Sequence, residues 1–352
     1  MTVYKKKNPT KNPWFCKFSY KDIKGITHQK KKEGFRTRKQ DLEYQENFLN
    51  EANSRPISCF KDLIQLYIAD KTNNVKPLTL TKITSVTSKY IRPYFSHYAI
   101  TEITPAIIRK WQTGIIQEGL SPSYTAIIST TLSSIFNFGI RYYNLSCNPV
   151  KIAGSVGSLK PTHTNFYTLE EYKIFSGNID DEYLLVIFDL LYYTGVRIGE
   201  LLALTSADIN FNTSTITISK TYYRLHNKDY IGTPKSLSSR REIPIPQFLL
   251  QELAHIYTIL GIKKEHHRVF SYTTARELND LAKIIAKKSS LPPLRLHDFR
   301  HSHASYLINE GFSPVAVRDR LGHSSVKITL DRYSHLYQNE KTKIADNLQE
   351  NH

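Results

Sequence analysis

The sequence is poor in cysteine, in acidic side chains and in long apolar runs, and each shortage excludes a class of protein. The three cysteines, Cys16, Cys59 and Cys147, lie far apart along 352 residues, so neither a disulfide framework nor a Cys-x-x-Cys metal site is indicated. No apolar run approaches the roughly 20 residues that span a membrane, and the lysine-rich start lacks the apolar stretch of a signal peptide. We therefore expect a cytoplasmic protein with no membrane partner.

The shortage of acidic residues leaves a strongly basic chain. Thirty-one Asp and Glu oppose 48 Lys and Arg, which gives a formal net charge of +17 and a pI near 9.5. Such a balance favours a polyanionic partner, and nucleic acid is the first to consider. The first 40 residues hold thirteen Lys and Arg against Asp22 and Glu33. Basic runs are often solvated tails, but the apolar and aromatic residues interleaved here favour a folded basic module.

The chain is long enough for two or three hydrophobic cores, and residues 1–55 form the first predicted domain. Residues 14–21 alternate between apolar and polar side chains, as a half-buried strand does, and a second strand follows between Gly25 and Gly34. Thr37 and Gln40 are spaced as a capping box at the start of a helix. We expect a small sheet with one helix.

Residues 56–150 predict an all-helical domain. Ser58 is placed to cap its first helix, further helices are expected around residues 79–95, and Thr104 and Ser121 are placed to cap two more.

Residues 151–165 are interpreted as a linker, because the stretch is rich in Gly, Pro, Ser and Thr and has no periodicity. Residues 166–352 form the third domain, in which a helix at 182–193 and strand patterns between 214 and 245 predict a mixed α+β fold. The predicted fold class is a multidomain protein, mainly α, with small β-sheets.

Reactive side chains gather in this third domain. Arg197 and Glu200 are three residues apart, so on a helix they share a face and the carboxylate steers the guanidinium, although such pairs are more often surface salt bridges. His297, Arg300 and His301 share one side of a later helix. The two histidines have the i, i+4 spacing of zinc ligands, but the charge of Arg300 between them disfavours a metal.

The last box holds His323, directly after Gly322, and then Tyr333. Tyr333 alone is more readily interpreted as a packed tyrosine, since the chain has 23 of them. In chain order, however, a larger set resembles the catalytic residues of the tyrosine recombinases, or phage-type integrases. That set is Arg197, Lys235, His297, Arg300, His323 and Tyr333, with Glu200 and His301 as supporting residues.

The matching strings are residues 194–204, the turn around Lys235, residues 297–301, residues 321–323 and residues 329–336. Phe299 and Ser302 stand where leucine and threonine are common in the family. The front of the chain also resembles integrases of phages, genomic islands or conjugative transposons of low-GC Gram-positive bacteria. The resemblance implies an arm-type DNA-binding domain at 1–55 and a core-binding, SAM-like domain at 56–150, ahead of a catalytic domain.

The resemblance also implies a mechanism. Tyr333 attacks a DNA phosphodiester and forms a 3′-phosphotyrosine, Arg197, Arg300, His297 and His323 stabilise the negative charge, His297 accepts the phenol proton and Lys235 protonates the leaving 5′-hydroxyl. Strand exchange would pass through a Holliday junction in a homotetramer.

Double-stranded attachment sites of core and arm type are the expected partners, together with a host bending factor or an excisionase, and the protein is expected at the nucleoid. No cofactor and no metal are expected. A type IB topoisomerase-like enzyme, a DNA-binding regulator without cleavage and a metal-dependent nuclease are the alternatives. The sequence disfavours the regulator, since no reactive position is missing.

Overall fold

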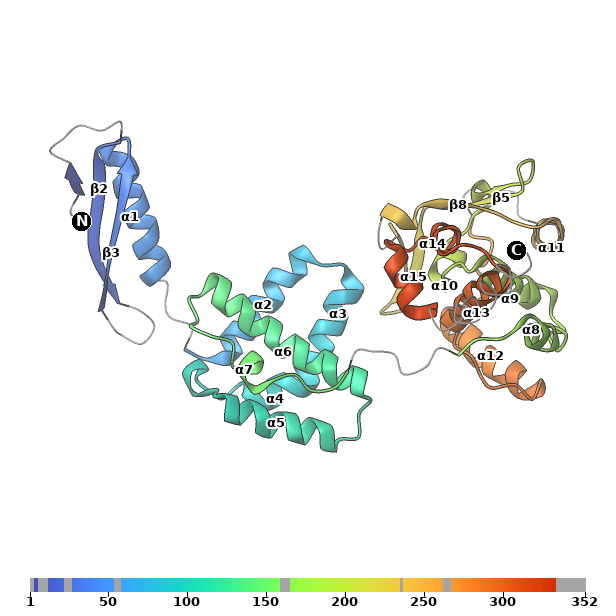
Figure 1. Ribbon diagram of the computed structural model, residues 1–352, viewed down its shortest axis with the longest axis horizontal. Helices are drawn as coiled ribbons and strands as arrows, with labels where there is room; N and C mark the ends of the chain where they lie inside the picture. Colours follow the sequence, from blue (N-terminus) through green and yellow to red (C-terminus); the bar gives the residue numbers. More distant parts are fainter. Residues whose placement is uncertain are drawn as a thin grey trace, which may run out of the picture. The chain divides into compact units, whose positions relative to one another are not determined.

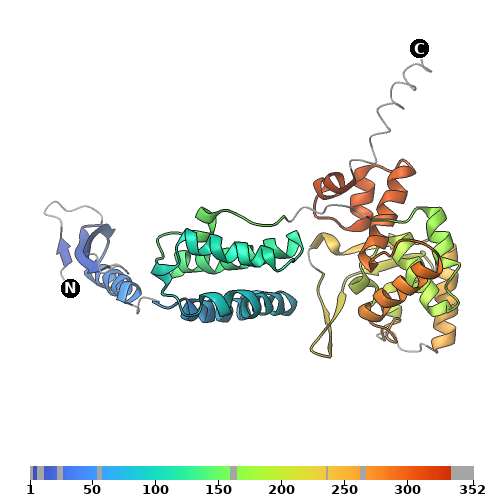
Figure 2. The same ribbon diagram turned by 90° about the horizontal axis from the view of Figure 1, so that it is seen from below.

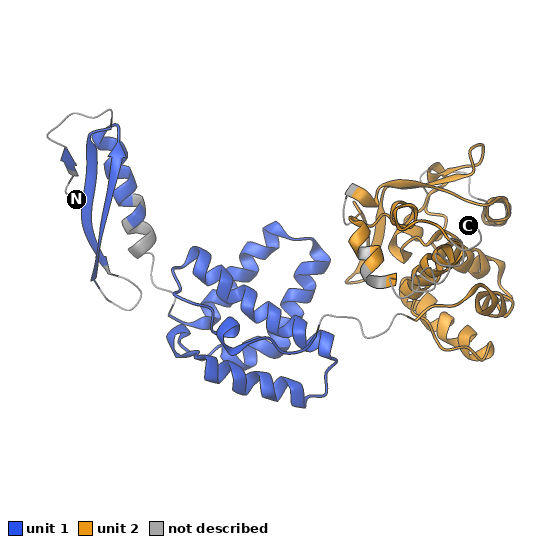
Figure 3. Ribbon diagram, in the orientation of Figure 1, with its two compact units in different colours: residues 1–161 blue, residues 162–352 orange. Residues whose placement is uncertain are grey.

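The computed structural model describes residues 3–5, 12–21, 27–53, 58–158, 165–234, 237–261 and 267–333. The chain divides into two compact units, Met1–Pro161 and Thr162–His352 (Figure 3). Both are mainly helical with small antiparallel sheets, so the predicted fold class is confirmed (Figure 1). Within the described ranges, no helix is long and apolar enough to cross a membrane.

The N-terminal part of unit 1 is a three-stranded antiparallel sheet with one helix. Its elements are β1 (Val3–Lys5), β2 (Trp14–Lys21), β3 (Thr27–Phe35) and α1 (Arg38–Asn53). Alternation along β2 buries Cys16 and Phe18, and the ring of Phe18 lies 5.4 Å from that of Phe48 on α1. The predicted helix start is present, since the Gln40 amide donates to Thr37 Oγ1 at 3.2 Å. The sequence did not predict β1, which has three residues.

The rest of unit 1 is a helical bundle, as predicted. Its elements are α2 (Phe60–Asn74), α3 (Pro77–Val86), the π-helical η1 (Thr87–Ile91), α4 (Arg92–Phe95), η2 (Ile100–Glu102), α5 (Pro105–Gln117), α6 (Pro122–Tyr142) and α7 (Pro149–Ala153). Thr104 and Ser121 cap α5 and α6 through their side-chain oxygens.

Two predictions about this bundle were wrong. Cys59, not Ser58, is the N-cap of α2, because the residue 58–60 backbone pairs with residues 98–100 before the helix begins. The stretch interpreted as a linker at 151–165 begins instead inside the short helix α7, which runs to Ala153. Asn148 caps that helix by accepting the Val150 amide at 3.0 Å, and Val150 is buried in the bundle core.

Unit 2 combines helices with two small sheets. Its elements are α8 (Leu169–Ser176), α9 (Glu182–Thr194), α10 (Ile198–Leu201), η3 (Ser206–Asp208), β4 (Ile209–Asn210), β5 (Thr215–Ile218), β6 (Thr221–Leu225), β7 (Lys228–Gly232), η4 (Leu237–Ser239), β8 (Arg241–Pro244), α11 (Gln247–Leu260), α12 (Ala275–Lys288), α13 (Leu296–Asn309), α14 (Pro314–Leu321) and α15 (Val326–Tyr333). One sheet has the order β4-β5-β8, and β6 pairs with β7 in a hairpin that projects from the body of the unit (Figure 2).

The core of unit 2 forms around α9 and α13, which pack against each other. Phe188 on α9 and Phe299 on α13 are fully buried, with ring centroids 5.4 Å apart. A smaller apolar cluster joins α13, α14 and α15, and Tyr333 belongs to it. The boxes singled out in the sequence therefore lie at helix ends that this core holds in place.

Candidate active site

Arg197 lies at the N-cap of α10, with an extended backbone, and not within the helix as the sequence predicted. The reason is the tight stop of α9 at Gly195, whose φ of +65° ends the preceding helix three residues before α10 begins. The Arg197 amide donates to Glu200 Oε2 at 3.1 Å, and its Nη1 donates to Oε1 at 2.6 Å. The carboxylate therefore holds both ends of Arg197, while 32% of the side chain stays exposed.

Glu200 is buried and pairs with a second arginine, Arg241 on β8, at 3.0 Å. Burial by itself raises the pKa of Glu200, but the charges of Arg241 and Arg197 outweigh it and leave the pKa below the ordinary value. Glu200 is therefore an anion at neutral pH.

Arg300 is 2% exposed and bridges two helix ends. Its Nη1 donates to the Gly195 carbonyl at 2.7 Å and its Nη2 to the Leu321 carbonyl at 2.6 Å. Burial, followed by the charge of Arg197, lowers the pKa of Arg300 to about 9, so the guanidinium stays protonated at neutral pH. A guanidinium has more N–H groups than these two carbonyls use, which leaves donors for a bound anion.

Tyr333 is 1% exposed, at the end of α15. Its Oη lies 2.5 Å from Nδ1 of His301, one residue after Arg300 on α13. The ring of His301 stands edge-on to that of His297, with centroids 4.9 Å apart, and His297 is exposed. Two histidines thus follow one another from the phenol toward the surface.

His323 follows Gly322, the left-handed C-cap of α14, as the sequence predicted. Its Nδ1 lies 2.9 Å from Oγ1 of the buried Thr329 on α15. A partner of this kind fixes the plane of an imidazole and sets which nitrogen carries the proton.

The structure thus brings five of these residues into one region around Arg300. The charges of Arg197, Glu200 and Tyr333 act on the pKa of Arg300, and His301 contacts Tyr333. His297 and His323 adjoin it through His301 and Thr329. Lys235 lies outside the described residues, as does the tail after Tyr333.

The sequence did not predict that Arg241 would bond Glu200 or that Thr329 would bond His323. Arg241 starts β8 two residues before the fully buried Ile243, so strand alternation places it on an inward face, and that signal was present. No sequence pattern around Thr329 indicates that its hydroxyl contacts His323.

Of the i, i+4 histidines considered above as metal ligands, His301 instead contacts the phenol of Tyr333, and His297 lies against the ring of His301. Among the described residues, no cluster of three or more His, Cys, Asp or Glu is placed to hold a metal ion.

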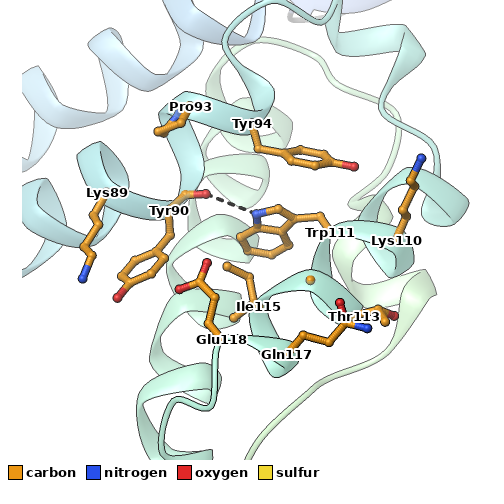
Figure 4. A pocket seen from close by; sticks show the side chains of 11 residues that line it. Lys89, Tyr90, Pro93, Tyr94, Lys110, Trp111, Thr113, Ile115, Gln117 and Glu118 are labelled. Carbon is orange, nitrogen blue, oxygen red and sulfur yellow. Dashed lines mark hydrogen bonds between the residues drawn. The ribbon is translucent and has the colours of Figure 1, made fainter.

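A hollow of about 680 Å³ lies in the helical bundle of unit 1 (Figure 4). Tyr90, Tyr94 and Trp111 line it beside Lys89 and Lys110, and Trp111 Nε1 donates to the Tyr90 carbonyl at 3.1 Å. The lining also holds Glu118 but no arginine, so the hollow lacks the guanidinium donors that lie beside Tyr333.

A tyrosine bonded to a histidine, beside two arginines with N–H donors to offer an anion, suits an enzyme that attacks phosphodiesters with a phenol oxygen. Comparison with known proteins agrees. The family model described as "Phage integrase family" matches residues 167–340, and "Phage integrase, N-terminal SAM-like domain" matches residues 59–116. The chain belongs to the phage integrase family and is a site-specific tyrosine recombinase that serves integration and excision of a mobile element.

Two relatives illustrate the similarity. The ICEBs1 integrase of Bacillus subtilis (strain 168) is 33% identical over 334 residues, which cover 89% of this chain and 90% of that protein. The integrase of Mycobacterium phage L5 is 25% identical over 251 residues, covering 68% of this chain and 66% of that protein.

Solved structures share the fold. The Tn1549 transposon integrase in complex with transposon right end DNA has a TM-score of 0.69 at 21% identity, over 82% of this chain and 99% of that one. A lambda integrase tetramer bound to a Holliday junction has a TM-score of 0.60 at 20% identity, over 92% of this chain and 95% of that one.

Proposed function

We propose that this recombinase cleaves double-stranded DNA at its attachment sites by attack of Tyr333 Oη on a phosphodiester. The bond from phosphorus to the 5′ oxygen breaks, and a 3′-phosphotyrosine remains. The observation that carries the proposal is the contact of Tyr333 with His301, next to the buried Arg300. Because Tyr333 is 1% exposed, the attack requires α15 to move toward the DNA.

Arginine and histidine side chains would stabilise the negative charge of the transition state. Arg197, Arg300, His297 and His323 would donate to the non-bridging oxygens, on which charge grows as the phosphorane forms. Arg300 is suited to this because two carbonyls fix its plane before DNA arrives. Glu200 would keep Arg197 in place, since it bonds both the amide and the guanidinium.

Proton transfer completes each step. Phenols hold their proton at neutral pH, with a pKa of about 10, so Tyr333 needs an acceptor as it bonds to phosphorus. The sequence suggested His297, whereas the described contact favours His301 as the immediate acceptor, with His297 beyond it. Lys235 stays our candidate to protonate the leaving 5′-hydroxyl.

Exchange of one phosphodiester for another conserves the bond energy, so rejoining needs no ATP and no metal ion. Attack by a different 5′-hydroxyl would exchange strands. By analogy with the lambda integrase tetramer bound to a Holliday junction, we infer a homotetramer that works through such a junction.

The basic N-terminal module fits a second DNA contact. Lys17 on β2 lies directly opposite Lys31 on β3, a like-charge pair that is partly offset by the ion pair of Lys31 with Glu33 at 2.5 Å. We propose residues 1–55 as the arm-type domain, residue 56 to the end of α7 as the core-binding domain and 166–352 as the catalytic domain, with the linker beginning after α7. A host bending factor or an excisionase would assist, at the nucleoid in the cytoplasm.

The test is covalent trapping on a nicked attachment-site duplex, in chelator, followed by a denaturing gel. We expect a protein–DNA adduct from the natural chain and none from Tyr333→Phe. Tyr272→Phe is the matched control, since Tyr272 is 74% exposed in the same unit, and it should give the adduct in full. Binding of the correct site without any adduct would refute the proposal.

A further inference from the structure

Arg241 does not belong to the catalytic set, yet it is 6% exposed and its guanidinium donates three hydrogen bonds. Nη2 donates to Glu200 Oε2 at 3.0 Å, Nε to the Arg320 carbonyl at 2.7 Å, and Nη1 to the Ser239 carbonyl at 3.0 Å. Each of its three nitrogens is therefore engaged within the protein, and the side chain is too deeply buried to reach DNA.

The three acceptors belong to three segments that carry proposed active-site residues. Glu200 holds Arg197 at 2.6 Å. Arg320 lies in the last turn of α14, which leads to His323. Ser239 ends η4, in the segment between Lys235 and β8.

The end of α14 packs tightly on this guanidinium. A Cβ added at Gly322 would lie 2.9 Å from the Ser238 carbonyl oxygen and 3.1 Å from Arg241 Cδ. Any shift of Arg241 would therefore be passed to the loop that carries His323.

A contribution to stability alone does not account for this arginine. Replacing a buried ion pair by apolar side chains of similar volume is often neutral for stability. What apolar side chains cannot do is fix the distance between a carboxylate on α10 and a carbonyl at the end of α14.

We propose that Arg241 is a positioning residue for strand cleavage, which sets Arg197 and His323 at the separation at which both reach one phosphate. The inference rests on the proposed function, because it assumes that the two side chains act on the same phosphodiester. Arg241 itself would touch neither DNA nor Tyr333.

The test compares Arg241→Met and Arg241→Lys with Arg240→Met, a neighbouring exposed arginine that loses the same charge. Two quantities are measured: Kd for the core duplex, and the single-turnover rate of adduct formation at saturating protein.

We expect Kd within about threefold of the natural chain and a rate about 100-fold lower for Arg241→Met, since displacement of a catalytic group by 1 Å costs that much. Arg241→Lys should fall between, because an ammonium keeps the charge beside Glu200 but cannot span three acceptors. Arg240→Met should keep the natural rate.

A pH profile separates positioning from a general loss of structure. The charged groups that face Glu200 are Arg197 on the α10 N-cap, Arg241 on β8 and Arg300 on α13. Without Arg241, burial would favour the protonated carboxyl, and Arg197 would lose its anchor as the pH falls. The rate of Arg241→Met relative to the natural chain should therefore decrease from pH 8 to pH 6, and adding Glu200→Gln should abolish that slope.

Adduct formation at the natural rate by a folded Arg241→Met would overturn the inference. So would a rate that falls only in step with Kd and thermal stability while the pH ratio stays flat. If Arg241→Met does not fold, Arg241→Lys carries the same comparison. Failure of the proposed function is distinguishable, since the natural chain itself would then form no Tyr333-dependent adduct.

Discussion

The contact between His301 and Tyr333, the proposed nucleophile, shows at the residue scale how the phenol is held before the reaction. The phenol is buried in the apolar cluster of α13, α14 and α15, where a hydroxyl without a partner would cost roughly 1–3 kcal/mol. His301 Nδ1 at 2.5 Å satisfies it. The same contact places an imidazole nitrogen beside the proton that the phenol loses in the proposed reaction.

We therefore predict that His301→Phe, which keeps the ring volume and removes the nitrogen, slows adduct formation by about 100-fold, as expected for loss of a general base. Kd for the core duplex should not change, because His301 is buried. His255→Phe is the control, since His255 is an exposed histidine on α11 that pairs with Glu182. Single-turnover cleavage measures the effect, and a rate equal to that of the natural chain would return the role of acceptor to His297.

At the scale of the elements, left-handed glycines at helix ends decide where the proposed reactive groups lie. Gly195 ends α9 and Gly322 ends α14. Arg300 donates to the carbonyl of Gly195 itself and to the carbonyl of Leu321, the residue before Gly322. At Gly195, an added Cβ would lie 2.7 Å from His303 Cδ2 and 2.8 Å from Leu321 Cδ2. Position 195 therefore requires glycine for two reasons, the left-handed backbone that ends α9 and the close packing of His303 and Leu321.

Gly195→Ala should destabilise the protein by about 3 kcal/mol, the combined cost of a left-handed backbone and of overpacking. It should also lower the cleavage rate, because the Gly195 carbonyl holds Arg300. Gly261→Ala isolates the backbone cost, since Gly261 is also left-handed, at the end of α11, but an added Cβ there meets nothing within 4 Å. We expect about 1 kcal/mol at that site. Urea unfolding measures both variants, and equal losses would show that the packing around Gly195 yields.

At the scale of the whole molecule, charge is concentrated in the N-terminal module. Thirteen of the 48 Lys and Arg lie in the first 40 residues. On β2 and β3, Lys17 and Lys31 face each other on the side of the sheet away from Cys16 and Phe18, which pack toward α1. Phosphate contacts release counterions from DNA, so each contact adds to the salt dependence of binding.

We predict that the double variant Lys17→Gln, Lys31→Gln lowers the slope of log Kd against log salt by about 2 on an arm-type duplex, close to 0.9 for each contact. The slope on a core duplex should stay unchanged. Lys283→Gln on α12, an exposed lysine paired with Asp280, is the control for loss of surface charge. Fluorescence anisotropy across a salt series gives the slopes. Equal reductions on both duplexes would contradict a separate arm-type site.

What the sequence determined by itself depends on local rules. The helix starts at Thr104 and Ser121 follow from side-chain caps, and the ends at Gly195 and Gly322 follow from backbone freedom. The order of the reactive boxes, and with it the family, could also be predicted, since each box is short and contiguous. Where local signals competed with pairing to a distant segment, as at Ser58, the prediction was wrong.

Only the tertiary structure decided which boxes meet and through which atoms. His301 bonds Tyr333 across 32 residues, and Arg241 bonds Glu200 across 41 and the Arg320 carbonyl across 79. No local spacing encodes such contacts, because they depend on how α9, α13 and α14 pack around a shared core. The sequence could therefore predict the family and propose its reactive residues, but the partner of the phenol and the arginine that joins three segments emerge only when that core brings distant side chains into hydrogen-bonding distance.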